Sequence, residues 1–281
     1  TTAAAHARRA DALTAGRRFR AARGLTHPID DFLYTYYSYK PSLLRRWHPG
    51  AGVVLADAPE RAGWRWYRAD GDGVSVDAAA FRAERAVLLR AIGGILHGAL
   101  SRNPRLGCFG LHEWAMVYRE PETRHAVPLR LGATGTDAVV EAHELHCTHL
   151  DAFRFFTPSA APRNATVLSR AGQAAAEQPG CLHANMDLYK WAVKLGPLVP
   201  GDLLLDAFEL ARDIRVVDMR ASPYDLREWG YAPIEVETDA GKREYIARQR
   251  GFAERARPLR AALLQIAGGQ VWHRRSPVRD F

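Results

Sequence analysis

The chain has 281 residues, of which 47% are hydrophobic and 25% charged, a balance that is ordinary for a soluble globular protein. This length can bury a large core within one domain, and no apolar run approaches the roughly 20 residues that a membrane-spanning helix needs. The net charge of +8 and the pI near 9.7 favour an anionic partner, with DNA as a candidate. Only four of the 39 basic residues are lysines, however, and this arginine bias is equally typical of a GC-rich coding sequence.

The three cysteines are too few, and too odd in number, for a disulfide framework. The N-terminal residues lack the apolar stretch of a secretory signal. We therefore expect reduced thiols in a cytoplasmic protein.

The first elements in chain order are helical. Residues 3–23 are rich in Ala and Arg and contain Asp11 as their one acid, which predicts a basic N-terminal helix or arm over 1–25, either a positive arm or a solvated face. Asp30 and Asp31 are expected to cap residues 32–47, which Pro41 divides into two short helical pieces.

A small β-element is expected near residues 51–76. Apolar and polar residues alternate there, and Asp-Gly pairs at 70–73 supply a turn. The two predicted strands are 53–55 and 64–67.

Most of the remaining chain has helical periodicity. The predicted helices are 78–101, 111–119, 137–145 with Thr136 as its cap, 182–198, 201–219, and 241–266 with an interruption or kink at Pro258. Residues 126–131 and 147–156 are candidate strands, 157–180 are expected to form an irregular loop, and 270–281 an irregular basic tail. The sequence thus predicts a mainly α, single-domain helical bundle over 1–281.

Every cysteine lies within four residues of a histidine, although the chain has only 11 histidines. The three places are Cys108 with His112, Cys147 with His143, His146 and His149, and Cys181 with His183. Such residues serve metal ligation, proton transfer and nucleophilic chemistry. We therefore expect the three segments to converge on one site.

The spacings within these segments suit ligands or proton carriers. His183 and Asp187 are four residues apart and share a helix face, and His112-Glu113 begins a predicted helix. Three interpretations stay open: a transition-metal or haem centre, metal-free acid–base catalysis, and structural burial of cysteines and histidines. The candidate catalytic residues are Glu113, Asp187, His112 and His183; the candidate metal ligands are His143, His146, Cys147, His149, Cys181 and His183.

Four acids, Asp202, Asp206, Glu209 and Asp213, recur at helical spacing along one predicted helix. They indicate either a wet face paired with Arg212 and Arg215, or a stripe that holds a di-metal centre or a catalytic water.

Aromatic and basic residues cluster at 34–48. Tyrosines of this density beside cations are typical of a stacking platform for bases, and also of a helix–core boundary. Arg220, in the polar turn after a long helix, is a candidate anion or carboxylate clamp.

Four stretches carry a resemblance to a known family: His-Pro-Ile-Asp-Asp-Phe-Leu-Tyr-Thr-Tyr-Tyr-Ser (27–38), Leu-Arg-Arg-Trp-His-Pro-Gly (44–50), Gly-Leu-His-Glu-Trp-Ala-Met-Val-Tyr-Arg (110–119) and Glu-Gln-Pro-Gly-Cys-Leu-His-Ala-Asn-Met-Asp-Leu-Tyr-Lys (177–190). Over residues 25–255 the chain resembles an actinobacterial family commonly labelled 3-methyladenine DNA glycosylase.

That resemblance implies a DNA-repair hydrolase that removes an alkylated purine base. Such an enzyme stacks the extruded base on aromatic rings and activates water with a carboxylate; Glu113 or Asp187 is the candidate for the carboxylate. The substrate-binding candidates are Tyr34, Tyr36, Tyr37, Trp47 and Trp114 for stacking and Arg45 and Arg46 for phosphates. The alternative is a metal- or haem-dependent, oxygenase-like enzyme that acts on a small aromatic or amino-acid substrate through the Cys/His segments.

Overall fold

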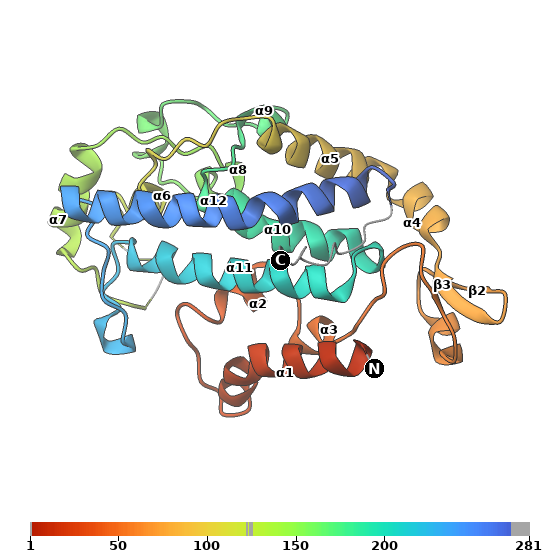
Figure 1. Cartoon of the computed structure of the whole chain (residues 1–281). Helices are drawn as coiled ribbons and strands as arrows, with labels where there is room; N and C mark the ends of the chain where they lie inside the picture. The colour runs from red at the N-terminus through yellow and green to blue at the C-terminus, as the bar shows by residue number, and fades with distance from the viewer. Residues whose placement is uncertain (1, 122, 124–125, 271–281) are drawn as a thin grey trace, which may run out of the picture.

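Figure 1 shows the computed structural model of the protein, which is mainly helical as the sequence predicted. The structure describes residues 2–121, 123 and 126–270, so nearly all of the predicted tail 270–281 lies outside the described residues. Within this part of the chain, no helix is both long and apolar enough to cross a membrane.

Three long helices form the centre of the molecule: α10 (Leu182–Leu195), α11 (Gly201–Arg220) and α12 (Asp239–Ala267). Helix α10 packs against both of the others, and α5 (Ala86–Leu100) packs against α12 on the side away from α11 (Figure 1). A helix that is buried nearly all round is normally apolar. Helix α10 instead buries His183, Asn185 and Asp187, and each of these polar groups needs a partner.

The remaining helices surround this centre, and most of them are short. The N-terminal ones are α1 (Thr2–Ala21), α2 (Phe32–Tyr36) and α3 (Pro41–Leu44). The others are α4 (Ala78–Glu84), α6 (Leu111–Ala115), α7 (Gly132–Glu141), α8 (Leu150–Phe153) and α9 (Gln173–Ala176), with 3-10 turns at Pro59–Gly63, Ala161–Arg163, Gly196–Leu198 and Arg227–Trp229.

The basic helix α1 is docked on the bundle and is not a free arm. It packs against α3 and α11 (Figure 1). Arg9 forms ion pairs with Asp206 at 2.7 Å and Glu209 at 2.5 Å, and Arg17 pairs with Asp31 at 2.9 Å. Asp206 and Glu209 thus lie on an arginine-paired face of α11, but their partner is Arg9 of α1 and not Arg215, which pairs with other acids.

The small β-element is present at one end of the molecule. Strands β1 (Val54–Leu55), β2 (Tyr67–Asp70) and β3 (Gly73–Val76) form an antiparallel sheet in the order β1-β3-β2. The predicted strand 64–67 is wrong except for its last residue, because Trp64 follows a 3-10 turn and Trp66 has a positive φ of 68°.

Other sequence predictions also need correction. Residues 147–156 contain α8 and no strand; their mixed apolar pattern reflects burial on several sides. Thr136 lies inside α7, where its hydroxyl donates to the carbonyl of Gly132 at 2.7 Å, and does not cap the helix. Helix α12 continues through Pro258. The predicted helix 78–101 is divided at Arg85 into α4 and α5.

The sheet region makes stability depend on pH through His48. Its ring accepts or donates a bond with the Tyr67 hydroxyl at 2.8 Å, and burial, with help from Arg46, Arg61 and His6, lowers the pKa of His48 to about 4. The unfolded chain, with a histidine pKa near ~6.5, binds the proton more readily. The free energy of unfolding should therefore be at its highest above pH ~6.5, and it should fall by up to about 3 kcal/mol as the pH approaches 4 and His48 is protonated.

Urea unfolding between pH 7 and 4 measures this dependence. The variant His48→Gln should show a flatter pH profile than the wild type. His97→Gln, at an exposed position on α5, is the matched control and should keep the wild-type slope; equal slopes for all three proteins would contradict the assignment.

Candidate active site

The three Cys/His segments meet in the folded chain. Cys108, Cys147 and Cys181 line one cavity of about 10 Å³, which is about the space of a single water molecule. The same cavity is lined by His112, His146, His149 and His183. The three segments therefore converge on one shared cavity, as the sequence predicted.

Two glutamines hold the segments before α6 and α10 together. The Gln249 amide donates to the carbonyl of Gly180 at 2.9 Å and to the Cys108 sulfur at 3.2 Å. The Gln178 carbonyl oxygen accepts from the backbone N–H groups of Arg105 at 2.8 Å and Gly180 at 2.7 Å. These bonds fix the starts of both helices relative to each other.

The turn into α6 requires a glycine. Gly110 has φ 72°, in the left-handed region that glycine adopts without strain. A side chain here would also meet the Tyr245 ring at 3.2 Å and Ala221 at 3.4 Å. This close approach brings His112 and Glu113 against α11.

The centre of the site is a buried group of four side chains from three helices. His112 and Glu113 come from α6, His183 from α10 and Asp218 from α11. One ligand atom from each lies within 4.8 Å of the others. All four residues are at most 8% exposed, so the group is closed to bulk solvent.

Arg215 of α11 holds the two acids of this group. Its Nη1 donates to Glu113 Oε1 at 2.8 Å and to Asp218 Oδ2 at 2.6 Å. The His112 Nε2–H donates to the other Asp218 oxygen at 3.0 Å. His183 Nε2 lies 3.8 Å from Asp218, and its Nδ1 is buried without a hydrogen-bond partner among the described residues.

Protonation states follow from burial and from these partners. Burial lowers the pKa of His183 well below its ordinary value, against the opposing effect of Asp218. Burial alone would raise the pKa of Asp218, but the hydrogen bond from His112 and the Arg215 guanidinium hold it below its usual range. His183 is therefore neutral, with a nitrogen lone pair, beside an ionised carboxylate.

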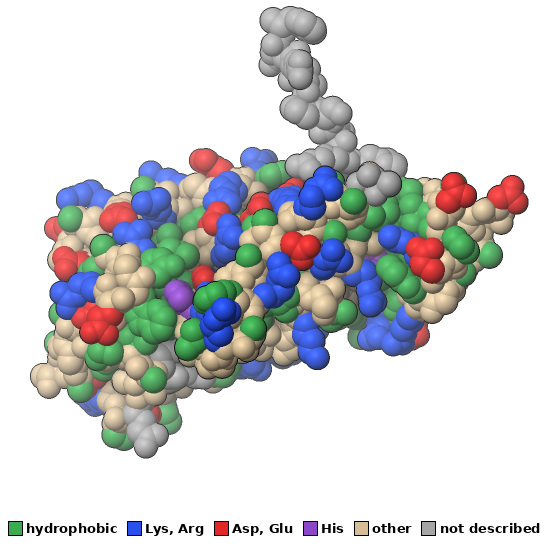
Figure 2. Space-filling view, turned by 90° about the horizontal axis from the view of Figure 1, so that it is seen from below, with side chains coloured by type: hydrophobic (Ala, Val, Ile, Leu, Met, Phe, Trp, Pro, Cys, Tyr) green, Lys and Arg blue, Asp and Glu red, His purple; other side chains and the backbone are tan. Residues whose placement is uncertain are grey.

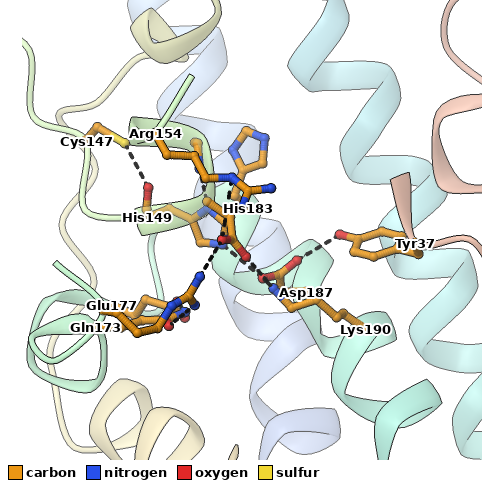
Figure 3. A network of polar contacts seen from close by, with 12 residues as sticks. Tyr37, Cys147, His149, Arg154, Gln173, Glu177, His183, Asp187 and Lys190 are labelled. Atoms are coloured by element: carbon orange, nitrogen blue, oxygen red, sulfur yellow. Dashed lines mark hydrogen bonds and ion pairs between the residues drawn. The ribbon is translucent and has the colours of Figure 1, made fainter. Parts of the chain in front are cut away.

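A second polar network begins one turn further along α10 (Figure 3). Asp187 accepts from the Tyr37 hydroxyl at 2.9 Å, from His149 Nε2 at 3.0 Å and from Lys190. Lys190 also donates to Asp151 at 2.9 Å. Because His149 Nδ1 accepts from the backbone N–H of Ala152 at 3.2 Å, its Nε2 carries the proton given to Asp187.

The charges of this network stabilise one another. Burial opposes ionisation of Asp187, but Lys190 and His149 keep the pKa of Asp187 below its usual range. Burial likewise opposes the charge on Lys190, whose pKa is raised above its ordinary value by Asp187 and Asp151. The His183 ring lies between the two networks, 4.3 Å from the His112 ring and 5.3 Å from the His149 ring, centroid to centroid.

A cavity of about 190 Å³ opens beside this centre. Glu113, His183 and Arg215 line it together with Met116, Asp151 and Ala152, and aromatic rings of Phe32, Tyr36 and Phe155 form part of its wall. Phe32 and Tyr36 are stacked at 4.9 Å with an interplanar angle of 11°. The arrangement offers an aromatic chamber in contact with a carboxylate, a neutral imidazole and a guanidinium.

Of the six ligands predicted from sequence, only His183 belongs to the group of four. His149 uses both ring nitrogens within the protein, as described above. His143 Nδ1 bonds to the carbonyl of Val139 at 2.7 Å, and the His146 side chain is 48% exposed. Burial raises the pKa of Cys147 to about 12 and that of Cys181 well above its ordinary value. Neither cysteine belongs to the group of four.

The predicted stacking residues are divided among different surroundings. Tyr36 lines the aromatic cavity, and Tyr37 points to Asp187. Tyr34 packs against Phe208, at 5.9 Å between ring centroids, and Trp47 against Arg61 at 5.1 Å. Trp114 is 0% exposed and donates to the carbonyl of Ala221, so it cannot stack on a ligand.

The predicted anion-binding arginines do not gather at the site. Arg45 pairs with Asp11 at 3.0 Å, Arg46 lies over the Trp64 ring at 4.9 Å, and Arg220 bonds to the carbonyl of Ala232 at 2.7 Å. Figure 2 shows basic side chains interspersed with acidic ones on the face that it presents. This face has no continuous basic strip for a DNA backbone.

The candidate site residues predicted from sequence did not include four residues that build the site: Asp151, Lys190, Arg215 and Asp218. Arg215 and Asp218 are three residues apart on α11 and lie off the stripe of the four other acids, among buried apolar residues. This spacing is the signal that could have drawn attention to the pair.

No family model, curated protein or solved structure matches the chain in the three comparisons. The site therefore has to be interpreted from its own geometry.

Proposed function

We propose that the chain is an enzyme that binds a divalent transition-metal ion through His112, Glu113, His183 and Asp218. Its substrate is a small molecule with an aromatic or apolar part, held in the adjoining cavity. The observation that carries the proposal is the convergence of two imidazoles and two carboxylates, all buried, within 4.8 Å.

The donor set fits such an ion. Imidazole and carboxylate together suit divalent iron, manganese and zinc, and two histidines with one carboxylate form a recurrent oxygenase site. His183 brings a buried Nδ1 without a partner among the described residues. Two carboxylates with one arginine leave one negative charge, which a divalent cation offsets.

A haem does not fit at His183. The cavities that this residue lines measure about 190 and 10 Å³, whereas ligands of drug size, which are smaller than a haem, use sites of roughly 300–1,000 Å³. The donors favour a single ion.

The protein's own residues would prepare the site for such chemistry. A bound divalent ion supplies a Lewis acid or, if it is iron, a redox centre. Arg215 orients Glu113 and Asp218 through the two bonds given above, which is the role of an outer partner in metal sites. The surrounding burial excludes water, and the aromatic wall positions the substrate beside Glu113 and His183.

Metal affinity tests the proposal directly. The purified protein, stripped with chelator, should bind Co²⁺ or Mn²⁺ with a stoichiometry of one in calorimetry, and Co²⁺ should give a visible spectrum of imidazole and carboxylate ligation. His183→Ala should weaken binding by at least about 100-fold, since losing even an outer partner costs roughly 10–100-fold.

His143→Ala is the matched control because this histidine belongs to the predicted set but not to the group of four; it should bind like the wild type. An unchanged Co²⁺ affinity in His183→Ala, with the fold intact by circular dichroism, would exclude the proposed centre.

Base excision is the second candidate, favoured by one observation: Glu113 lies in a cavity with three aromatic rings, the combination that such an enzyme needs for an extruded base. Release of free methylated adenine from alkylated duplex DNA by metal-free protein would favour this candidate over the metal-dependent one.

A further inference from the structure

A larger cavity adjoins the aromatic one. It measures about 520 Å³ and shares Tyr36 and Asp151 with the cavity at His183. This volume is within the range of roughly 300–1,000 Å³ that small-molecule sites occupy. The two cavities are therefore neighbours, with Tyr36 and Asp151 at their common border.

The walls of the larger cavity differ in character. One wall is apolar and comes from α5, with Leu88, Ala91, Ile92 and Ile95. Four other lining residues are basic, namely Arg154, Arg170, Lys190 and Lys194, while Asp151 is the one acid among the described lining residues.

These basic residues have more positive charge than the neighbouring acids compensate. Lys190 is paired with Asp187 and Asp151. Among the described acids, Arg154 and Arg170 form ion pairs with this same Asp151, at 3.9 and 3.3 Å. Arg170 also donates to the neutral Gln173 side chain at 2.7 Å. Lys194 is exposed and forms no ion pair among the described residues. The four cations Arg154, Arg170, Lys190 and Lys194 are therefore balanced by only two aspartates, Asp151 in the lining and Asp187 behind it.

We propose that this cavity binds the anionic group, a phosphate or a carboxylate, of a small molecule whose aromatic or apolar body reaches the cavity at His183. Arginine and lysine recognise both oxyanions through charge-assisted hydrogen bonds, and a cleft lined with one sign of charge concentrates ligands of the opposite sign. The inference rests on the proposed function for what happens at His183, but the anion site depends only on the larger cavity and its charges.

Calorimetry on the full chain, stripped of metal with chelator, tests the proposal with three probes: phenyl phosphate, phenylacetate and phenol. At least one of the two anions should bind about tenfold or more tightly than phenol, because a hydrogen bond to a charged group contributes on the order of 1.5–3 kcal/mol. The tighter anion identifies the site as one for phosphate or for carboxylate.

The double variant Arg154→Glu with Lys194→Glu should lose this preference, with at least a tenfold weaker affinity for the tighter anion. The control is Arg250→Glu, an exposed arginine of α12 that does not line this cavity, and it should bind like the wild type.

Two results would overturn the anion site: phenol binding as tightly as both anions, or an unchanged anion affinity in the double variant. Because the protein is metal-free in this experiment, such a failure leaves the Co²⁺ result untouched. Conversely, anion binding without any Co²⁺ binding would remove the proposed metal centre alone.

Discussion

Replacing Arg215 by methionine is expected to lower the free energy of unfolding by about 3–5 kcal/mol. Arg215 is 1% exposed and is the cation between Glu113 and Asp218. Its removal leaves two buried carboxylates without their compensating charge, which costs more than the lost bonds themselves. Urea unfolding at pH 7 measures the effect.

The same variant also reports on the proposed metal centre. A divalent ion bound to the folded state stabilises it by mass action, and it would replace part of the missing positive charge. Excess Mn²⁺ should therefore restore more stability to Arg215→Met than it adds to the wild type.

Arg255→Met is the matched control. Arg255 of α12 pairs at 2.6 Å with Asp213, which lies on α11 as Arg215 does. The side chains of Arg255 and Asp213 are 50% and 40% exposed. Such an exposed ion pair contributes only ~0–1 kcal/mol to stability. If Arg215→Met and Arg255→Met have the same free energy of unfolding, the expected cost of leaving two charged carboxylates buried without Arg215 is absent, and the prediction is wrong.

The sequence predicted the helical class well because apolar periodicity records burial on one helix face at a time. It located α10 and α11 to within a few residues. The prediction failed at 147–156 and at 64–67. These short segments are buried on several sides or contain turns, so their apolar residues follow neither the helical nor the strand periodicity.

The site was only partly predictable for a related reason. The cysteine and histidine segments identified which parts of the chain converge, but not which atoms meet. His112 forms its hydrogen bond with Asp218, which lies 106 residues further along the chain. No local spacing indicates that contact. The four acids on the outer face of α11 were visible as a pattern, whereas Asp218 was hidden among apolar neighbours on the same helix.

The shared helix face of His183 and Asp187 was predicted correctly, yet the two residues serve different networks. His183 faces Asp218 of α11, and Asp187 faces His149 and Lys190. Two residues that are four apart on α10 thus belong to two different polar clusters. The clusters are distinct because α6, α8 and α11 contact different parts of α10, which the spacing alone does not indicate.

Asp187→Asn is the second substitution expected to have a large effect, a loss of about 3–5 kcal/mol in the free energy of unfolding. Asp187 is 1% exposed and accepts from Tyr37, His149 and Lys190. An amide keeps the shape but removes the charge beside Lys190, and its NH₂ group confronts the donors of these partners.

A double-mutant cycle with Lys190→Met separates the charge effect from a general loss of packing. If the buried ion pair causes the loss, the double variant should be less destabilised than the sum of the two single variants by about 1–3 kcal/mol. Asp225→Asn, whose partner Arg227 is 67% exposed, should cost no more than ~1 kcal/mol. Strictly additive single effects would mean that Asp187 and Lys190 do not depend on each other, and the network would then be held by Tyr37 and His149 instead.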